Sequence, residues 1–273
     1  MKNVMFTLLA CLLIAGAAPR AAIAHEFWIE PQEFQVETGA PLTASLRNGQ
    51  HFEGITLAYF DRRIVRFDWR MGGDANPVTG RAGDNPALNL AAPEAGLMVL
   101  TYQSTASEVR YKTWEKFAQF AEHKSFADIQ ARHRARDLPD ADFTEVYTRY
   151  AKSLIAIGAG MGADRATGLE IEIVALQNPY TRSETGPLPV QVLYQDAPRA
   201  DAQVEIFERA PDGTVVVTTI RTNDAGIAKV PVRPGHAYLL DNVVLRVPAP
   251  AVAEAHGAVW ETLWASLTFA VPH

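Results

Sequence analysis

The chain has 273 residues, of which 48% are apolar, and its 25 basic residues stand against 31 acidic ones, a formal net charge of −6. A surface with this charge is a poor partner for a phosphate backbone, so nucleic-acid binding is not expected. The length and apolar content are sufficient for one large domain or two modest ones.

The first 24 residues have the pattern of a cleavable secretory signal peptide. Lys2 supplies a basic start, an apolar run follows, and the small residues Ala22 and Ala24 precede His25. The run is shorter than the roughly 20 apolar residues of a spanning helix. We therefore expect cleavage between Ala24 and His25, a periplasmic or secreted location, and no stable membrane insertion after cleavage.

Cleavage would change the composition in two ways. Loss of Lys2 and Arg20 leaves 23 basic against 31 acidic residues, so the mature chain becomes more acidic. Cys11 is the only cysteine and leaves with the leader. The exported protein then has no disulfide, and its stability must come from its core.

The mature chain begins and ends with strand patterns. Short apolar runs between turn residues predict strands across 34–102, a clean alternation predicts one at 169–174, and further short runs predict β-structure across 190–271. Between 112 and 160, aromatic and apolar residues at helical spacing predict one helix from Lys112 and a second, capped by Asp142, through Leu154.

These elements predict a mainly β fold with two β-sandwich domains of immunoglobulin or transthyretin type. The first domain is expected to cover 25–177, with a helical insertion at about 112–160. A polar link that contains proline follows, and the second domain is expected to cover 187–273.

A mature N-terminal histidine is the most specific chemical feature of the sequence. The α-amine and the imidazole of His25 can close one chelate ring around Cu²⁺, Ni²⁺ or Co²⁺. Glu26 adds a carboxylate, and His51 lies beside a turn that can meet the amino terminus across a sheet edge, so it is the expected second ligand. Further candidate metal ligands are His236 and His256. The alternative for each of these histidines is an ordinary surface or loop residue.

Other polar and aromatic residues point to structure rather than chemistry. His123 and His133 are ten residues apart, not the four that places two ligands on one helix face, and we expect both on the solvated surface. Tyr147, Tyr150 and Lys152 fall in the expected second helix and are expected to pack the insertion on the first sheet; the alternative for Lys152 is to hold a carboxylate in the interface. The five tryptophans either pack the core or line a ligand groove, and core packing is favoured.

No catalytic motif is present. The sequence contains no Gly-x-Ser-x-Gly, no His-Glu-x-x-His, no phosphate-binding glycine loop and no cysteine nucleophile outside the leader. An enzyme is therefore not indicated, although a copper redox enzyme built on His25 remains an alternative.

Several short motifs, in a characteristic order, resemble the DUF4198 family of secreted bacterial proteins. They are His25-Glu26-Phe27-Trp28-Ile29-Glu30-Pro31, Phe52-Glu53-Gly54, Tyr150-Ala151-Lys152, Gly168-Leu169-Glu170-Ile171-Glu172, Asn178-Pro179-Tyr180 and Trp264-Ala265-Ser266-Leu267-Thr268-Phe269. The resemblance covers almost the whole mature chain. It implies a β-rich periplasmic protein with a helical insertion, associated in some members with nickel and cobalt uptake.

One departure from the family pattern concerns the last hairpin. Relatives often have a histidine near the segment that reads Asp241-Asn242-Val243-Val244-Leu245-Arg246 here, and this chain has none. If that histidine is a metal ligand in the relatives, this member must use another group.

The sequence thus predicts a periplasmic protein that binds or delivers a divalent transition metal, nickel or cobalt by resemblance and copper by ligand chemistry, for an uptake transporter in the inner membrane. One alternative is a carbohydrate- or protein-binding β-sandwich module without a metal. The other is the copper redox enzyme.

Overall fold

The computed structural model describes residues 25–183 and 185–273, and it is mainly β, as the sequence predicts. Within these residues no helix is long and apolar enough to cross a membrane. The expected leader and its cleavage site lie outside the described residues.

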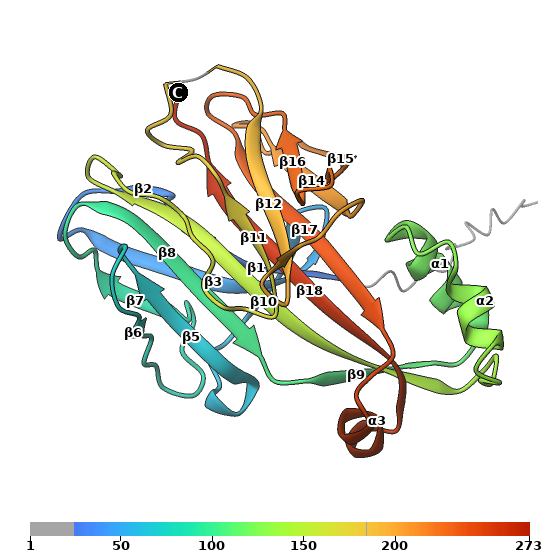
Figure 1. Cartoon of the computed structure of the whole chain (residues 1–273). Helices are drawn as coiled ribbons and strands as arrows, with labels where there is room; N and C mark the ends of the chain where they lie inside the picture. Colours follow the sequence, from blue (N-terminus) through green and yellow to red (C-terminus); the bar gives the residue numbers. More distant parts are fainter. Residues whose placement is uncertain (1–24, 184) are drawn as a thin grey trace, which may run out of the picture.

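One large sheet organises the molecule (Figure 1). Its strand order is β15 (Val215–Arg221), β14 (Gln203–Arg209), β17 (Ala237–Arg246), β18 (Ala258–Ala270), β10 (Phe143–Ile157), β8 (Gly96–Ser104), β5 (Ile64–Arg70) and β6 (Asn76–Pro77), and the short strands β2 (Gln35–Val36) and β9 (Ser107–Tyr111) also pair with β10. A 3-10 turn, η1 (Asp61–Arg63), leads into β5.

Two smaller sheets cover opposite faces of the large one. The first consists of β1 (Glu26–Pro31), β3 (Pro41–Gln50) and β4 (Glu53–Leu57), with β7 (Leu88–Ala91) on β3; the second consists of β11 (Ile171–Ala175), β12 (Leu188–Tyr194) and β13 (Ala197–Pro198), with β16 (Ile227–Val230) on β12. Ala151 and Ile155 of β10 pack in the core with Ile29 of β1, whereas Leu154 packs with Ile171 of β11. Because side chains alternate along a strand, the two small sheets face opposite sides of β10.

The prediction of a second helix is wrong, because Phe143–Ile157 is strand β10. Its second half is buried on both faces, so its apolar residues do not alternate with polar ones. A short apolar run of this kind fits a helical pattern as well as a buried strand. The expected first helix is present as α1 (Trp114–His123), and a short helix α2 (Ile129–Arg134) follows it.

The ranges predicted as two domains contribute to the same sheet. β10 from the first range and β18 from the second pair in parallel from Thr144 to Ser153. Two β-sandwich cores are present, one under each small sheet, and the large sheet is common to both.

Helices α1 and α2 lie at one end of the large sheet (Figure 1). Phe117 and Phe120 of α1 pack on Trp260 and Trp264 of β18, on the same face of the sheet as Val243 of β17. The third helix, α3 (Pro250–His256), leads into β18. The apolar face of α1 therefore covers the part of the large sheet that the β1 sheet leaves open.

His133 is not on the surface, which corrects the expectation for it. Its ring is fully buried, its Nδ1 accepts a hydrogen bond from Trp260 Nε1 at 3.0 Å, and its Nε2 lies 3.0 Å from the carbonyl oxygen of Pro139. These partners require a neutral ring with the proton on Nε2. The residue is thus a polar link inside an aromatic core.

Lys152 lies on strand β10, not on a helix, and holds two carboxylates inside the molecule. Its ammonium lies 2.8 Å from Asp164 Oδ1 and 3.5 Å from Glu172 Oε2, and all three side chains are buried. The contact between Lys152 of β10 and Glu172 of β11 joins these two strands across the core. Core packing is also confirmed for Trp28, Trp260 and Trp264.

Candidate functional site

A cluster of charged residues fills the seam between the β1 sheet, the end of α1 and the large sheet. Glu26 lies on β1, Glu205 on β14 and Asp241 on β17, and Lys124 directly follows α1. Glu205 and Asp241 are opposite each other in the antiparallel β14–β17 pair, so both side chains point to the same face. Glu26 is brought over them by the β1 strand.

The Lys124 ammonium sits among the three carboxylates. Its Nζ donates to Glu26 Oε1 at 3.1 Å, to Glu205 Oε2 at 2.6 Å and to Asp241 Oδ2 at 2.9 Å. All four side chains are buried. The three hydrogen bonds satisfy every donor of the ammonium, but they use one oxygen of each acid.

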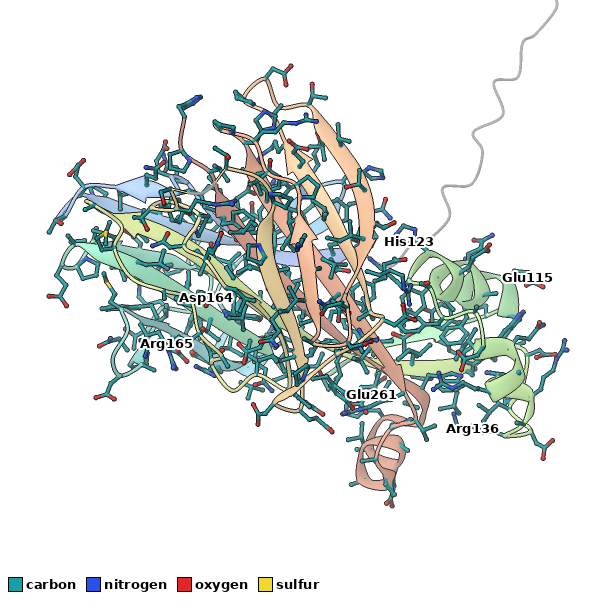
Figure 2. All side chains as sticks on the ribbon, turned by 45° about the horizontal axis from the view of Figure 1, so that its top comes forward. Glu115, His123, Arg136, Asp164, Arg165 and Glu261 are labelled. Carbon is teal, nitrogen blue, oxygen red and sulfur yellow. The ribbon has the colours of Figure 1, made fainter. Side chains whose placement is uncertain are left out.

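His123 adds a nitrogen donor at the edge of this cluster. Its Nε2 lies 3.0 Å from Glu205 Oε1, the oxygen that Lys124 does not use, and its side chain is 43% exposed. Figure 2 shows His123 at the end of α1 that faces the strands. Ligand atoms of Glu26, His123 and Glu205 lie within 4.8 Å of one another. Among the described residues, no other group of three or more such donors meets this distance.

Burial and neighbouring charges shift the pKa values of the cluster residues in different directions. Burial raises the pKa of Glu26 to about 7, although Lys124 opposes the shift. Burial also tends to raise the pKa of Glu205, but the hydrogen bond from His123 and the charge of Lys124 outweigh it and the pKa is lowered. The hydrogen bond to Glu205 raises the pKa of His123. The Glu205 carboxyl is therefore ionised at neutral pH, while Glu26 is close to its midpoint.

His51 lines the same hollow, of about 260 Å³, as Glu26, His123 and Glu205. It occupies a two-residue turn between β3 and β4, where His51 and Phe52 have φ of 55° and 59°. Such values are uncommon outside glycine and asparagine. The Phe52 ring is buried against Trp28, with centroids 5.6 Å apart, and this packing holds the turn in place.

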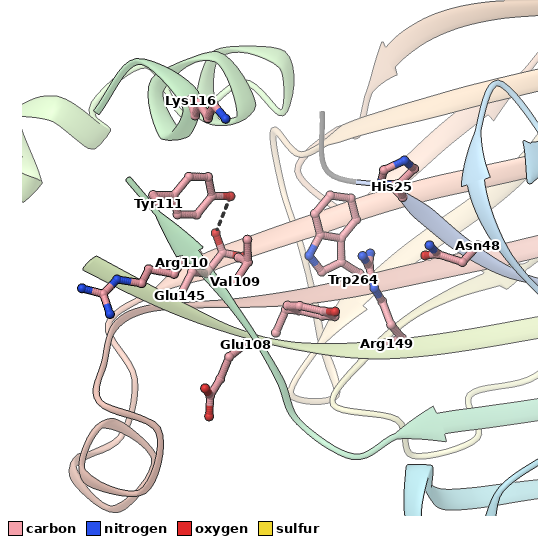
Figure 3. Close-up of a pocket in the computed structure, with 11 residues that line it drawn as sticks. His25, Asn48, Glu108, Val109, Arg110, Tyr111, Lys116, Glu145, Arg149 and Trp264 are labelled. Carbon is pink, nitrogen blue, oxygen red and sulfur yellow. Dashed lines mark hydrogen bonds between the residues drawn. The ribbon is translucent and has the colours of Figure 1, made fainter. Parts of the chain in front are cut away.

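His25 lies at a different hollow from its neighbour Glu26. His25 directly precedes β1 and lines a cavity of about 300 Å³ together with Trp264 (Figure 3). The structure therefore places Glu26 and His51 at one hollow and the imidazole of His25 at another. The proposed chelate through the His25 amine depends on a cleavage outside the described residues and stays a prediction.

The cavity beside His25 contains a buried arginine. The Arg149 guanidinium lies over the Trp264 ring at 4.2 Å and over the Tyr147 ring at 4.9 Å. At the other end of the cavity, the Tyr111 hydroxyl donates to Glu145 Oε2 at 3.0 Å (Figure 3). Burial raises the pKa of Glu145 to about 7.

His236 and His256 are not part of the group formed by Glu26, His123 and Glu205. His236 Nδ1 lies 2.9 Å from Glu208 Oε1, and His256 Nδ1 lies 2.8 Å from Glu108 Oε1. Each is thus a histidine paired with one carboxylate.

Sequence reasoning missed most of the cluster. It selected Glu26 and His51, placed His123 on the solvated surface, and did not single out Lys124, Glu205 or Asp241. The available signal was the charged residue at an inward position of an otherwise apolar strand, as in Val204-Glu205-Ile206 and Leu240-Asp241-Asn242. Such a residue is almost never buried without a partner.

Comparisons with known proteins give a family and a remote structural likeness. Among curated proteins no significant match is found. Of the solved structures, the D0-D1 domain of Intimin is 12% identical, with 89% of this chain and 97% of that chain covered, at a TM-score of 0.22. Residues 22–244 match the family model described as "Domain of unknown function (DUF4198)". Since this match spans well over half of the sequence, the chain belongs to the DUF4198 family.

Proposed function

We propose that this chain is an exported protein that binds or delivers a divalent transition metal for an uptake transporter in the inner membrane. The observation that carries the proposal is the Glu26–His123–Glu205 group, with donor atoms within 4.8 Å of one another beside His51. Nickel or cobalt follows from the family resemblance, and copper from the ligand chemistry.

The charge balance of the cluster supports a further cation. When all three acids are ionised, the single charge of Lys124 leaves two negative charges uncompensated. In this buried setting the excess is costly, and either protons or another cation must offset it. The pKa values of Glu26 and His123 are raised, so both groups hold a proton more readily here than in water.

The donor types fit the proposed ions. Imidazole nitrogen suits nickel, copper and zinc, and carboxylate oxygen completes their coordination. Lys124 uses Glu26 Oε1 and Glu205 Oε2, so the other oxygen of each carboxylate is not bonded to it. His51 adds a second imidazole to the hollow. The exposed side of His123 leaves the site open, as exchange with a transporter requires.

The test is a metal titration of protein exported to a bacterial periplasm, whose intact mass establishes whether it begins at His25. Wild type should take up one Ni²⁺, Co²⁺ or Cu²⁺ ion. The variant His123→Ala should bind it roughly tenfold more weakly or worse, because a direct ligand is lost. Its melting temperature should hardly change, since the side chain is 43% exposed. Affinity should rise with pH through about 7, where Glu26 loses its proton.

The matched control is His256→Ala, which removes another histidine paired with a single carboxylate. Its metal affinity should equal that of wild type. Absence of uptake by the wild-type protein, or equal affinity in His123→Ala, would show that the proposal is wrong. A version with one extra residue before His25 separates the roles of the two hollows: weaker uptake assigns the His25 amine as a ligand, and unchanged uptake restricts the site to side chains.

A further inference from the structure

The Arg149 cavity is separate from the metal cluster and has a chemistry of its own. Arg149 is only 8% exposed, and its Nη1 is fully buried without a hydrogen-bond partner among the described residues. Within that same part of the chain, no carboxylate oxygen lies within ion-pair distance of its guanidinium. This contrasts with Lys124, which is paired to three acids.

The surrounding rings fix the guanidinium but do not satisfy it. Trp264 and Tyr147 interact with the flat faces of the group, at 4.2 and 4.9 Å. The N–H donors of a guanidinium lie in its plane and point outward from its edges. Stacking therefore orients these donors while leaving them free, and a buried cation in this state costs several kcal/mol unless an acceptor reaches it.

The other residues of the cavity favour an anion as that acceptor. Two carboxylates line the cavity, and both already have partners. Glu145 accepts hydrogen bonds from Tyr111 and Thr262, and Glu108 Oε1 lies 2.8 Å from His256 Nδ1. Lys116, on the rim, makes no ion pair within the described part of the chain (Figure 3). The free charges that face the cavity are thus both positive.

The size and the apolar lining favour an organic ligand over an inorganic ion. The cavity measures about 300 Å³ and includes Val109, Tyr111 and the Trp264 ring beside its charged groups. This volume is at the lower end of the range for small-molecule sites. A bare phosphate or sulfate would leave most of the space and its apolar walls without contacts.

We propose that this cavity binds a small organic carboxylate, with the carboxylate in the plane of the Arg149 guanidinium. A carboxylate matches the paired N–H donors of a guanidinium edge. The organic part would lie along Val109 and Tyr111. His25 borders the same cavity, so the residue that opens the mature chain would stand at its entrance.

The test is calorimetric titration of the full mature protein with benzoate and with succinate. Benzamide serves as the uncharged analogue of benzoate, and phosphate and sulfate serve as inorganic anions. At least one of the two carboxylates should bind saturably to wild type and more tightly than benzamide, phosphate or sulfate. Absence of saturable binding by both carboxylates, or equal binding by the inorganic anions, overturns the proposal.

The variant Arg149→Met should bind the same carboxylate roughly tenfold more weakly or worse, because a charge-assisted pair of hydrogen bonds is lost. Its melting temperature should not fall, because methionine removes an unpaired buried charge. Arg149→Lys keeps the charge but not the fork and should also bind more weakly. Arg62→Met is the control, since Arg62 also stacks on a ring, Phe60, at 4.8 Å. Wild-type affinity in Arg149→Met, or equal losses in Arg62→Met, would also overturn the assignment.

Discussion

Trp264 lies beside two buried cations whose surroundings differ. Lys124 Nζ lies 4.9 Å from the centre of the indole ring, and Arg149 Cζ lies 4.2 Å from it. Lys124 has three carboxylate partners, and these raise its pKa despite burial. Burial lowers the pKa of Arg149, with only weaker opposition from nearby charges. The same aromatic side chain therefore contacts both cations and lines the Arg149 cavity.

Glu145 should make the stability of the protein depend on pH. Burial raises its pKa to about 7 from 4.5. The folded protein then holds a proton that the unfolded chain releases between these values, so this group stabilises the fold below about pH 4.5 and loses that effect as the pH rises through about 7. The loss amounts to about 3 kcal/mol at most, at 1.36 kcal/mol for each pKa unit.

The variant Glu145→Gln removes this titration and keeps the shape of the side chain. We expect its free energy of unfolding, measured by urea denaturation from pH 4.5 to 8, to fall less steeply with pH than that of wild type. Glu26 supplies a residual slope of the same sign. The control is Glu115→Gln on α1, whose carboxyl is fully exposed. Parallel profiles for wild type and Glu145→Gln would contradict the assignment.

At the level of single residues, the sequence singled out Glu26 of the Glu26–His123–Glu205 group, and His51 of the hollow beside it. Glu26 was selected because it follows the expected mature terminus, and His51 because it lies near a turn. His123 was rejected on helical spacing, a rule that considers only ligands on one helix. Its partner Glu205 is on a strand 82 positions further along the chain. Contacts of this kind depend on the sheet topology, which local patterns do not contain.

Among the elements, the spacing of apolar residues predicted the type of element correctly where polar residues alternate with the apolar ones. The alternation at 169–174 corresponds to β11, and the spacing from Lys112 corresponds to α1. β10 was misread because small sheets cover both of its faces. Its one charged residue in the doubly covered half, Lys152, is fully buried. In a helix such a residue would have marked a polar face.

Lys152 should be essential to the join between β10 and β11. Its replacement by methionine leaves Asp164 and Glu172 buried without a counter-charge. Breaking a buried pair in this way typically costs about 3–5 kcal/mol. We therefore expect Lys152→Met to lower the free energy of unfolding by about that amount, measured by chemical denaturation at neutral pH.

Neutralising the acids tests the cause of that loss. In the triple variant Lys152→Met, Asp164→Asn and Glu172→Gln none of these three side chains is charged, and part of the stability should return. Glu172 also accepts bonds from the backbone of Thr167 and Gly168, so recovery should be incomplete. If the triple variant is less stable than Lys152→Met alone, an uncompensated charge is not the source of the loss.

On the scale of the whole molecule, one sheet connects the two predicted sequence ranges. β10 is hydrogen-bonded to β18 on one side and to β8 on the other. The small β1 sheet also contacts the second range, because the Thr268 hydroxyl of β18 donates to the carbonyl oxygen of Ile29 at 2.7 Å. The sequence was divided into two domains at the polar link between two runs of predicted strands. That division could not reveal the pairing, because β18 is the last strand of the chain and yet lies in the centre of the sheet, beside β10.

This topology predicts that residues 25–273 unfold as one unit. A fragment of residues 25–177 would lose β18 and expose the edge of β10, together with the apolar side chains that β17 and β18 cover. A fragment of residues 187–273 would lose β10 and β11, and with them Leu154 and Ile171 from its core. Neither fragment should melt cooperatively alone, and the protein of residues 25–273 should show one calorimetric transition whose van't Hoff and calorimetric enthalpies agree. Two resolved transitions, or a cooperatively folded 187–273 fragment, would instead establish independent domains.

Mixing the two fragments offers a further check. Because parallel β10–β18 pairing requires both fragments, any recovered structure should depend on the concentration of each.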